Sequence, residues 1–161
     1  LADIPIKKRF SFQPAIHFVI KGTQEKETSG GETEKVTLTT SNIEIPLNFL
    51  YKVPGNNGQF FIGAGPSLCY SIGGKLKYED ETDSESIDIE FGNNEDEDFM
   101  RAFDFSANFL TGYSFSNGLL LSLNYNLGLN NLFPGGPDDG TLKSRYFGIR
   151  LGYLLNSKTK K

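Results

Sequence analysis

The sequence predicts an all-β, antiparallel, up-and-down transmembrane β-barrel, and three observations support this fold class. Six segments alternate apolar residues with small or polar residues at the period of two that is typical of a β-strand. The apolar face of all six segments carries no charged residue, while Gly, Ser and Asn are common on the other face. The connections alternate between short turns and long polar links. A charge that faces lipid at mid-bilayer costs about 2–4 kcal/mol, which explains an uncharged outer face.

The first predicted strand, 10–20, shows the alternation most clearly. Its outward side chains are Phe10, Phe12, Pro14, Ile16, Phe18 and Ile20, and its inward ones include Ser11, Gln13 and His17. The same alternation predicts the remaining five strands, 43–51, 60–70, 103–113, 119–129 and 147–155. The sequence therefore contains six predicted membrane-spanning strands.

The connections predict how the barrel is oriented. Short turns fall at 53–58 and 116–118, and both contain the Asn-Gly pair that favours hairpins. Long polar links fall at 22–35, 74–102 and 130–144. Outer-membrane barrels have short periplasmic turns and long external loops. We therefore expect one barrel domain, 1–155, with these three links as external loops and both chain ends in the periplasm, and a basic periplasmic tail at 156–161.

Six strands are fewer than the eight of the smallest common outer-membrane barrels. An open sheet edge in lipid leaves backbone groups unsatisfied at a cost of several kcal/mol each. The segment 1–6 resembles the end of a strand that enters a turn at Lys7 and Lys8. We therefore expect six visible strands of eight, with the N-terminal strands missing. A partner that supplies strands and a smaller closed barrel are the alternatives.

A soluble β-sandwich or lipocalin-like barrel is the alternative fold. There the apolar face would form the interior, and the other face would carry Lys and Glu rather than Gly, Ser and Asn. Small side chains fit a narrow barrel lumen better than a wet surface. The basic residues cluster near the chain ends without a basic, aromatic-rich surface, so nucleic acid is not an expected partner.

Charged residues are scarce on the predicted inner face. Glu44 and Arg150 are both expected there near mid-depth, where an unpaired charge costs several kcal/mol. We predict an ion pair between them, or a shared hydrogen-bond network with Gln13, Asn48 and Asn124. Its expected role is a structural plug that ties strands together, and a proton or ion path is the alternative.

His17 is the only histidine of the chain and is predicted to face inward. A hydrogen-bonded lumen histidine is expected, and Asp104 is its candidate partner. No His and Cys cluster predicts a metal site, and Cys69 is expected to be a small buried side chain. No arrangement of nucleophile, base and acid follows from the spacing, so neither catalysis nor a cofactor is expected.

The segment 79–98 holds 11 of the 20 acidic residues. A solvated external loop is the first interpretation. A weak Ca²⁺ site is the second, although the EF-hand spacing is absent. Its candidate ligands are Asp80, Asp83, Glu85, Asp96 and Asp98. Alternation over 86–91 also predicts that the flanking strands extend beyond the membrane as a hairpin.

Several short motifs, in this order and spacing, resemble the PorT-type outer-membrane β-barrel family of Gram-negative bacteria. They are Arg9–Pro14, Ile43–Leu47, Phe61–Pro66, Phe103–Phe105, Leu123–Leu129 and Gly148–Tyr153. The resemblance implies an eight-stranded barrel, an outer-membrane location, no catalytic residues and, for some members, a link to protein secretion. The chain departs from the general outer-membrane pattern at 156–161, where a terminal aromatic residue is common.

We therefore expect a non-enzymatic outer-membrane barrel that acts as a structural or accessory subunit of an envelope complex. Its expected partners are outer-membrane lipid and other outer-membrane or periplasmic proteins. The alternatives are a narrow pore or transporter and a soluble lipocalin-like carrier of an apolar ligand.

Overall fold

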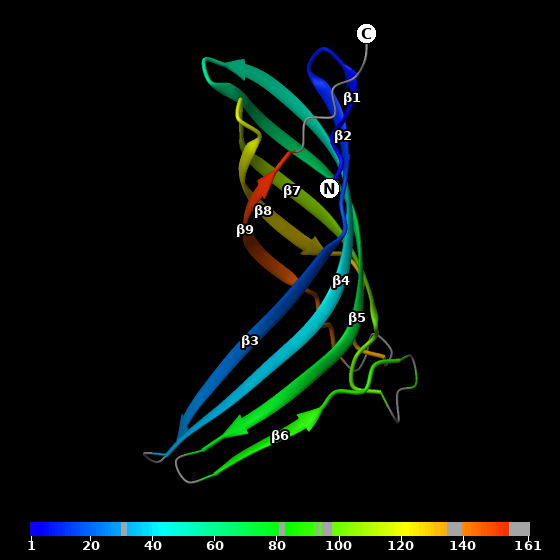
Figure 1. The fold of residues 1–161 in the computed structure, drawn as a ribbon. Coiled ribbons are helices and arrows are strands. Elements are labelled where there is room, and N and C mark those ends of the chain that lie inside the picture. Colours follow the sequence, from blue (N-terminus) through cyan, green and yellow to red (C-terminus); the bar gives the residue numbers. More distant parts are fainter. Residues whose placement is uncertain (30–31, 81–82, 93, 95–97, 135–139, 155–161) are drawn as a thin grey trace.

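The computed structural model describes residues 1–161 except 30–31, 81–82, 93, 95–97, 135–139 and 155–161. The described chain forms one curved antiparallel sheet (Figure 1). Its nine strands are β1 Ile4–Lys7, β2 Phe10–Pro14, β3 His17–Ser29, β4 Glu32–Gly55, β5 Gly58–Glu79, β6 Ser84–Asp88, β7 Phe103–Phe115, β8 Leu119–Gly128 and β9 Arg145–Tyr153. Among the described residues, no helix is long and apolar enough to cross a membrane.

The six predicted spans are present, and the first of them is interrupted. Both β2 and β3 pair with β4, so together they form one span beside it. The break falls between Pro14 and His17, opposite Pro46 of β4: the amide of Ala15 donates to the Pro46 carbonyl, but Pro46 has no amide hydrogen to donate in return. The alternation survives the break, because Ala15 is buried and Ile16 is exposed.

The outward orientation of the apolar faces is confirmed. Phe18 and Leu121 are exposed by 64% and 46%, whereas Gln13 and Asn48 on the opposite face are almost completely buried. The apolar side chains therefore surround the sheet, and the polar ones line its concave side. A soluble lipocalin-like carrier needs the reverse arrangement.

Two predicted loops contain strands. The segment 22–35 continues as a paired hairpin of β3 and β4 down to Ser29 opposite Glu32. In 74–102, β5 runs to Glu79 and pairs with β6, which places a hairpin within the segment where alternation predicts one. With 24 residues in β4 and 22 in β5, these strands are about twice as long as the ~9–11 residues that cross a bilayer. Figure 1 shows them extending well beyond β7, β8 and β9.

The sheet is open, with the order β1-β2-β4-β5-β7-β8-β9 along its main path. Within the described residues, β9 pairs only with β8, and the outer edge of β3 has no paired strand. The short strand β1 lies beside β2, with Ile4 opposite Phe12, and enters a turn at the same end as the β4–β5 turn. The amide of Ala2 donates to the carbonyl of Pro14, so this residue lies near mid-height of the sheet rather than at the short-turn end.

Candidate functional site

The concave side of the sheet carries the candidate site, and its polarity changes along the axis. At the end with the short turns, Leu50, Phe61, Leu110 and Leu120 form a buried apolar cluster against which Leu154 packs. One residue comes from each of β4, β5, β7 and β8, so the cluster covers four neighbouring strands on the concave side. This layer was not predicted, because Gly, Ser and Asn dominate the inner face. The inward period of two nevertheless includes all four positions.

The next layer consists of neutral amides and hydroxyls. Asn108 Nδ2 donates to Asn48 Oδ1 at 2.9 Å, which joins β7 to β4 over the intervening strand β5. Asn126 is fully buried, and neither its amide nitrogen nor its oxygen has a hydrogen-bond partner within the described residues. Buried polar groups of this kind bind ordered water when space allows. The layer is therefore polar and favourable for internal hydration.

Arg150 lies at the height of this amide layer. Its Nη2 donates to Gln13 Oε1 at 3.1 Å, and its Nε donates to Ser122 Oγ at 3.1 Å. These two contacts link β9 to β8 and, across the lumen, to β2. The expected hydrogen bonding between Arg150 and Gln13 is therefore present.

The expected ion pair between Glu44 and Arg150 is wrong. Glu44 Oε2 instead accepts a hydrogen bond from the Tyr146 hydroxyl at 2.6 Å. Tyr146 and Arg150 are four residues apart on β9, which is about 13 Å along a strand. Glu44 and Asn48 are separated by the same step on β4. The acid and the base therefore share a face of the sheet but lie at different heights.

Asn124 faces the lumen as predicted, but it packs against Gly148 instead of joining the predicted hydrogen-bond network. It lies opposite Gly148 on β9, where an added Cβ would come within 2.7 Å of the Asn124 side-chain oxygen. Gly148 therefore leaves the room that this amide occupies. Among the described contacts, Asn124 has no hydrogen bond to Glu44 or Arg150.

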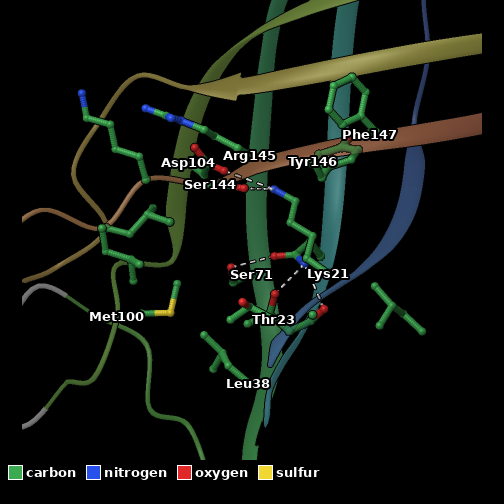
Figure 2. A pocket seen from close by; sticks show the side chains of 17 residues that line it. Lys21, Thr23, Leu38, Ser71, Met100, Asp104, Ser144, Arg145, Tyr146 and Phe147 are labelled. Atoms are coloured by element: carbon green, nitrogen blue, oxygen red, sulfur yellow. Dashed lines mark hydrogen bonds and ion pairs between the residues drawn. The ribbon is translucent and has the colours of Figure 1, made fainter. Parts of the chain in front are cut away.

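A charged cluster follows towards the long loops (Figure 2). Lys21 Nζ forms an ion pair with Asp104 Oδ2 at 3.1 Å and donates to Ser144 Oγ at 3.2 Å. It also lies 3.4 Å from Cys69 Sγ and 5.2 Å from the ring centre of Tyr146. Asp104 is thus neutralised by a lysine from β3, so the proposed contact between His17 and Asp104 is not formed.

His17 is half-buried and lies opposite Glu44 in the β3–β4 pair. Within the described residues its imidazole has no hydrogen-bond partner, so the expected hydrogen-bonded histidine side chain is not found. Cys69, in contrast, is buried as predicted.

Three residues of this cluster were not predicted from the sequence: Lys21, Ser144 and Tyr146. A signal for two of them was present, because Lys21 continues the inward alternation of His17 and Val19, and Tyr146 continues that of Arg150 and Gly148. Both were overlooked because the predicted strands ended at 20 and began at 147.

The acidic segment makes local contacts where it is described. The amide of Asp83 donates to Asp80 Oδ1, and the amide of Asn94 donates to Asp98 Oδ2. Glu85 is exposed on β6, and Asp96 lies outside the described residues. No group of three metal-binding side chains converges in the described part of the chain.

Several charges on the long hairpins are paired. Lys35 and Lys77 contact Glu79 at 2.8 and 2.7 Å, and Lys75 lies 3.7 Å from Asp88. Hydrogen bonds from Lys35 and Lys77 lower the pKa of Glu79 to about 2. These contacts connect β4, β5 and β6 beyond the apolar band.

Comparison with known proteins gives one match. A family model described as "Outer membrane protein beta-barrel domain" matches residues 1–134. Neither the curated proteins nor the solved structures contain a significant match to the chain. The matched range includes every strand from β1 to β8.

Proposed function

Because the chain belongs to the outer membrane protein β-barrel domain family, we propose that it is a structural or accessory subunit of an envelope complex in the outer membrane. Barrels of this family are generally non-enzymatic. We also propose that the short turns face the periplasm and the long hairpins face the exterior, as in other outer-membrane barrels.

The observation that carries this proposal is the buried apolar cluster near the short turns. Leu50, Phe61, Leu110 and Leu120 are each at most 4% exposed, and they form one cluster across the short-turn end. An apolar constriction of this kind excludes water and ions from a channel. A barrel that neither conducts nor catalyses contributes to the envelope through its surfaces.

The long hairpins offer such a surface. The sheet of β3, β4, β5 and β6 continues past the apolar band and is held by ion pairs between neighbouring strands. Exposed strand edges bind other chains by adding a strand to the sheet. We propose the edges of β3 and β6 as the contact with the rest of the complex. The PorT-type motifs of the sequence support a secretion apparatus as the kind of complex involved.

A narrow pore is the second candidate function. The unpaired buried polar atoms of the amide layer favour it, because they allow water into the long-loop half of the lumen. Passage through the whole barrel also requires displacement of the apolar cluster. This requirement makes the accessory role the better-supported function.

Two measurements test the proposal. In planar bilayers, the purified protein is expected to give no discrete conductance steps, and reproducible steps would establish the pore instead. In cells, a photoreactive amino acid at Ser86 of β6 is expected to give adducts of defined mass. The same group at Asn57 of the β4–β5 turn serves as the control. Absence of adducts from Ser86 would contradict the proposed contact at the β6 edge.

A further inference from the structure

A cavity of about 450 Å³ opens at the long-loop end, beside the charged cluster (Figure 2). Its lining comes mainly from β3, β4, the first residues of β9 and the segment that leads into β9, with single residues of β5 and β7. Two chemical kinds of side chain meet there. The basic ones are Lys21, Lys143 and Arg145, and prominent apolar ones are Ile20, Leu142 and Phe147. The volume lies within the range of ~300–1,000 Å³ that is usual for small-molecule sites.

The cavity has excess positive charge, because three basic side chains and one acidic side chain line it. The acidic one, Asp104, forms an ion pair with Lys21. Lys143 and Arg145 are exposed, and within the described residues neither side chain has a hydrogen bond or an ion pair. By contrast, Lys35, Lys75 and Lys77 on the long hairpins each contact an acidic side chain. Two cations at this rim are thus available to an external anion.

Lys143 and Arg145 also lie at the edge of the apolar band. On the outward face of β9, Phe147, Ile149 and Leu151 are exposed by 85%, 79% and 71%. Arg145 and then Lys143 continue this same face in steps of about 7 Å. The face therefore changes from apolar to basic over one step, as expected where acyl chains give way to headgroups.

We propose that this cavity binds a phosphate-bearing anionic lipid of the leaflet on the long-hairpin side. Lys143 and Arg145 contact the phosphate oxygens, with the guanidinium able to donate two parallel hydrogen bonds. An acyl chain lies along Ile20 and Phe147, which are exposed beside it. A lipid is favoured over a free anion because these apolar walls continue into the lipid-facing surface. The site does not depend on the proposed accessory role.

The probe is bisphosphorylated lipid A, titrated into the full chain in neutral detergent, with binding followed by native mass spectrometry. A basic residue near an anionic lipid surface contributes about a fivefold gain in affinity. The double variant Lys143→Ala/Arg145→Ala is therefore expected to bind about thirtyfold more weakly. The control Lys75→Ala/Lys77→Ala removes two cations that already have acidic partners, and it should bind as the wild type does.

Three further arms complete the test. Dephosphorylated lipid A should lose affinity to the same extent as the double variant does. Inorganic phosphate at millimolar concentration should not displace the lipid. The variant Lys143→Arg/Arg145→Lys keeps both positive charges and should retain binding. Its binding also shows that substitution at these two positions leaves the fold intact. Wild-type affinity in the double alanine variant would overturn the proposal, as would an equal loss in the control variant. Displacement by phosphate alone would assign a site for free anions instead.

Discussion

The lipid-facing orientation of β8 predicts that Leu123→Arg destabilises the barrel in a bilayer by about 2–4 kcal/mol. Leu123 is 56% exposed and lies between Thr111 on β7 and Ile149 on β9. An arginine at this position therefore enters hydrocarbon rather than the lumen. The cost arises because a guanidinium loses its hydration there.

The magnitude depends on the depth of the residue, which follows from the strand geometry. The outward face runs ten residue steps from Leu119 to Leu129. At about 3.4 Å per step and a tilt of about 40°, these steps cover roughly 26 Å along the membrane normal. This length matches the apolar band of about 25 Å in outer-membrane barrels. Leu123 then lies about 3 Å from the midplane and Leu129 at the edge, where the same substitution costs about 0–1 kcal/mol.

The free energy of unfolding is measured by urea titration of the protein in phosphatidylcholine vesicles. Circular dichroism is the suitable signal, because the chain contains no tryptophan. Leu129→Arg is the matched control, since only the depth of the new charge differs. If Leu123→Arg destabilises the barrel no more than Leu129→Arg does, the assignment of this face to lipid is refuted.

The remaining predictions concern the lumen and the long hairpins. Tyr146→Phe should lower the free energy of unfolding by about 1–3 kcal/mol in the same assay, because the buried Glu44 carboxylate loses its donor. Phe61→Ala should lower it by about 3–5 kcal/mol, since its side chain is buried in the apolar cluster. Carboxyl NMR should place the pKa of Glu79 near 2, and Lys35→Gln should raise it towards 4.5. Because the folded-state pKa is lowered, this contact stabilises the hairpins fully above pH 4.5 and is lost as the pH falls towards 2.

The spans and their orientation could be predicted from the sequence because lipid constrains every outward residue. A single charge at Phe105, Leu123 or Ile149 would have broken the pattern, and none is present. The extension of β4 and β5 beyond the membrane could not be predicted in the same way. The apolar alternation there is short, with Val36 and Leu38 on β4 and Leu76 and Tyr78 on β5, and it lies among Thr, Lys and Glu.

The contacts inside the lumen required information that alternation does not contain. A period of two assigns each side chain to a face but gives no height along the axis. Glu44 and Arg150 share a face, yet the register places them on different levels with Tyr146 and Gln13 as their partners. That register depends on how β4 and β9 align across the lumen, and these strands are not neighbours in the sheet.

The order of the lumen layers gives a physical reason for where charge lies along this barrel. Desolvation of a charge is most costly where water is excluded, and the apolar cluster around Phe61 excludes water from its own layer. Neutral amides follow, and the ion pair of Lys21 with Asp104 lies next to the open cavity at the long-loop end. On the other side of the cluster, the ion pair of Lys52 with Asp3 lies at a second cavity of about 440 Å³ beside the short turns. The apolar cluster therefore separates two charged ends, so binding at the long-loop rim needs no movement of the cluster, whereas transport through the barrel does.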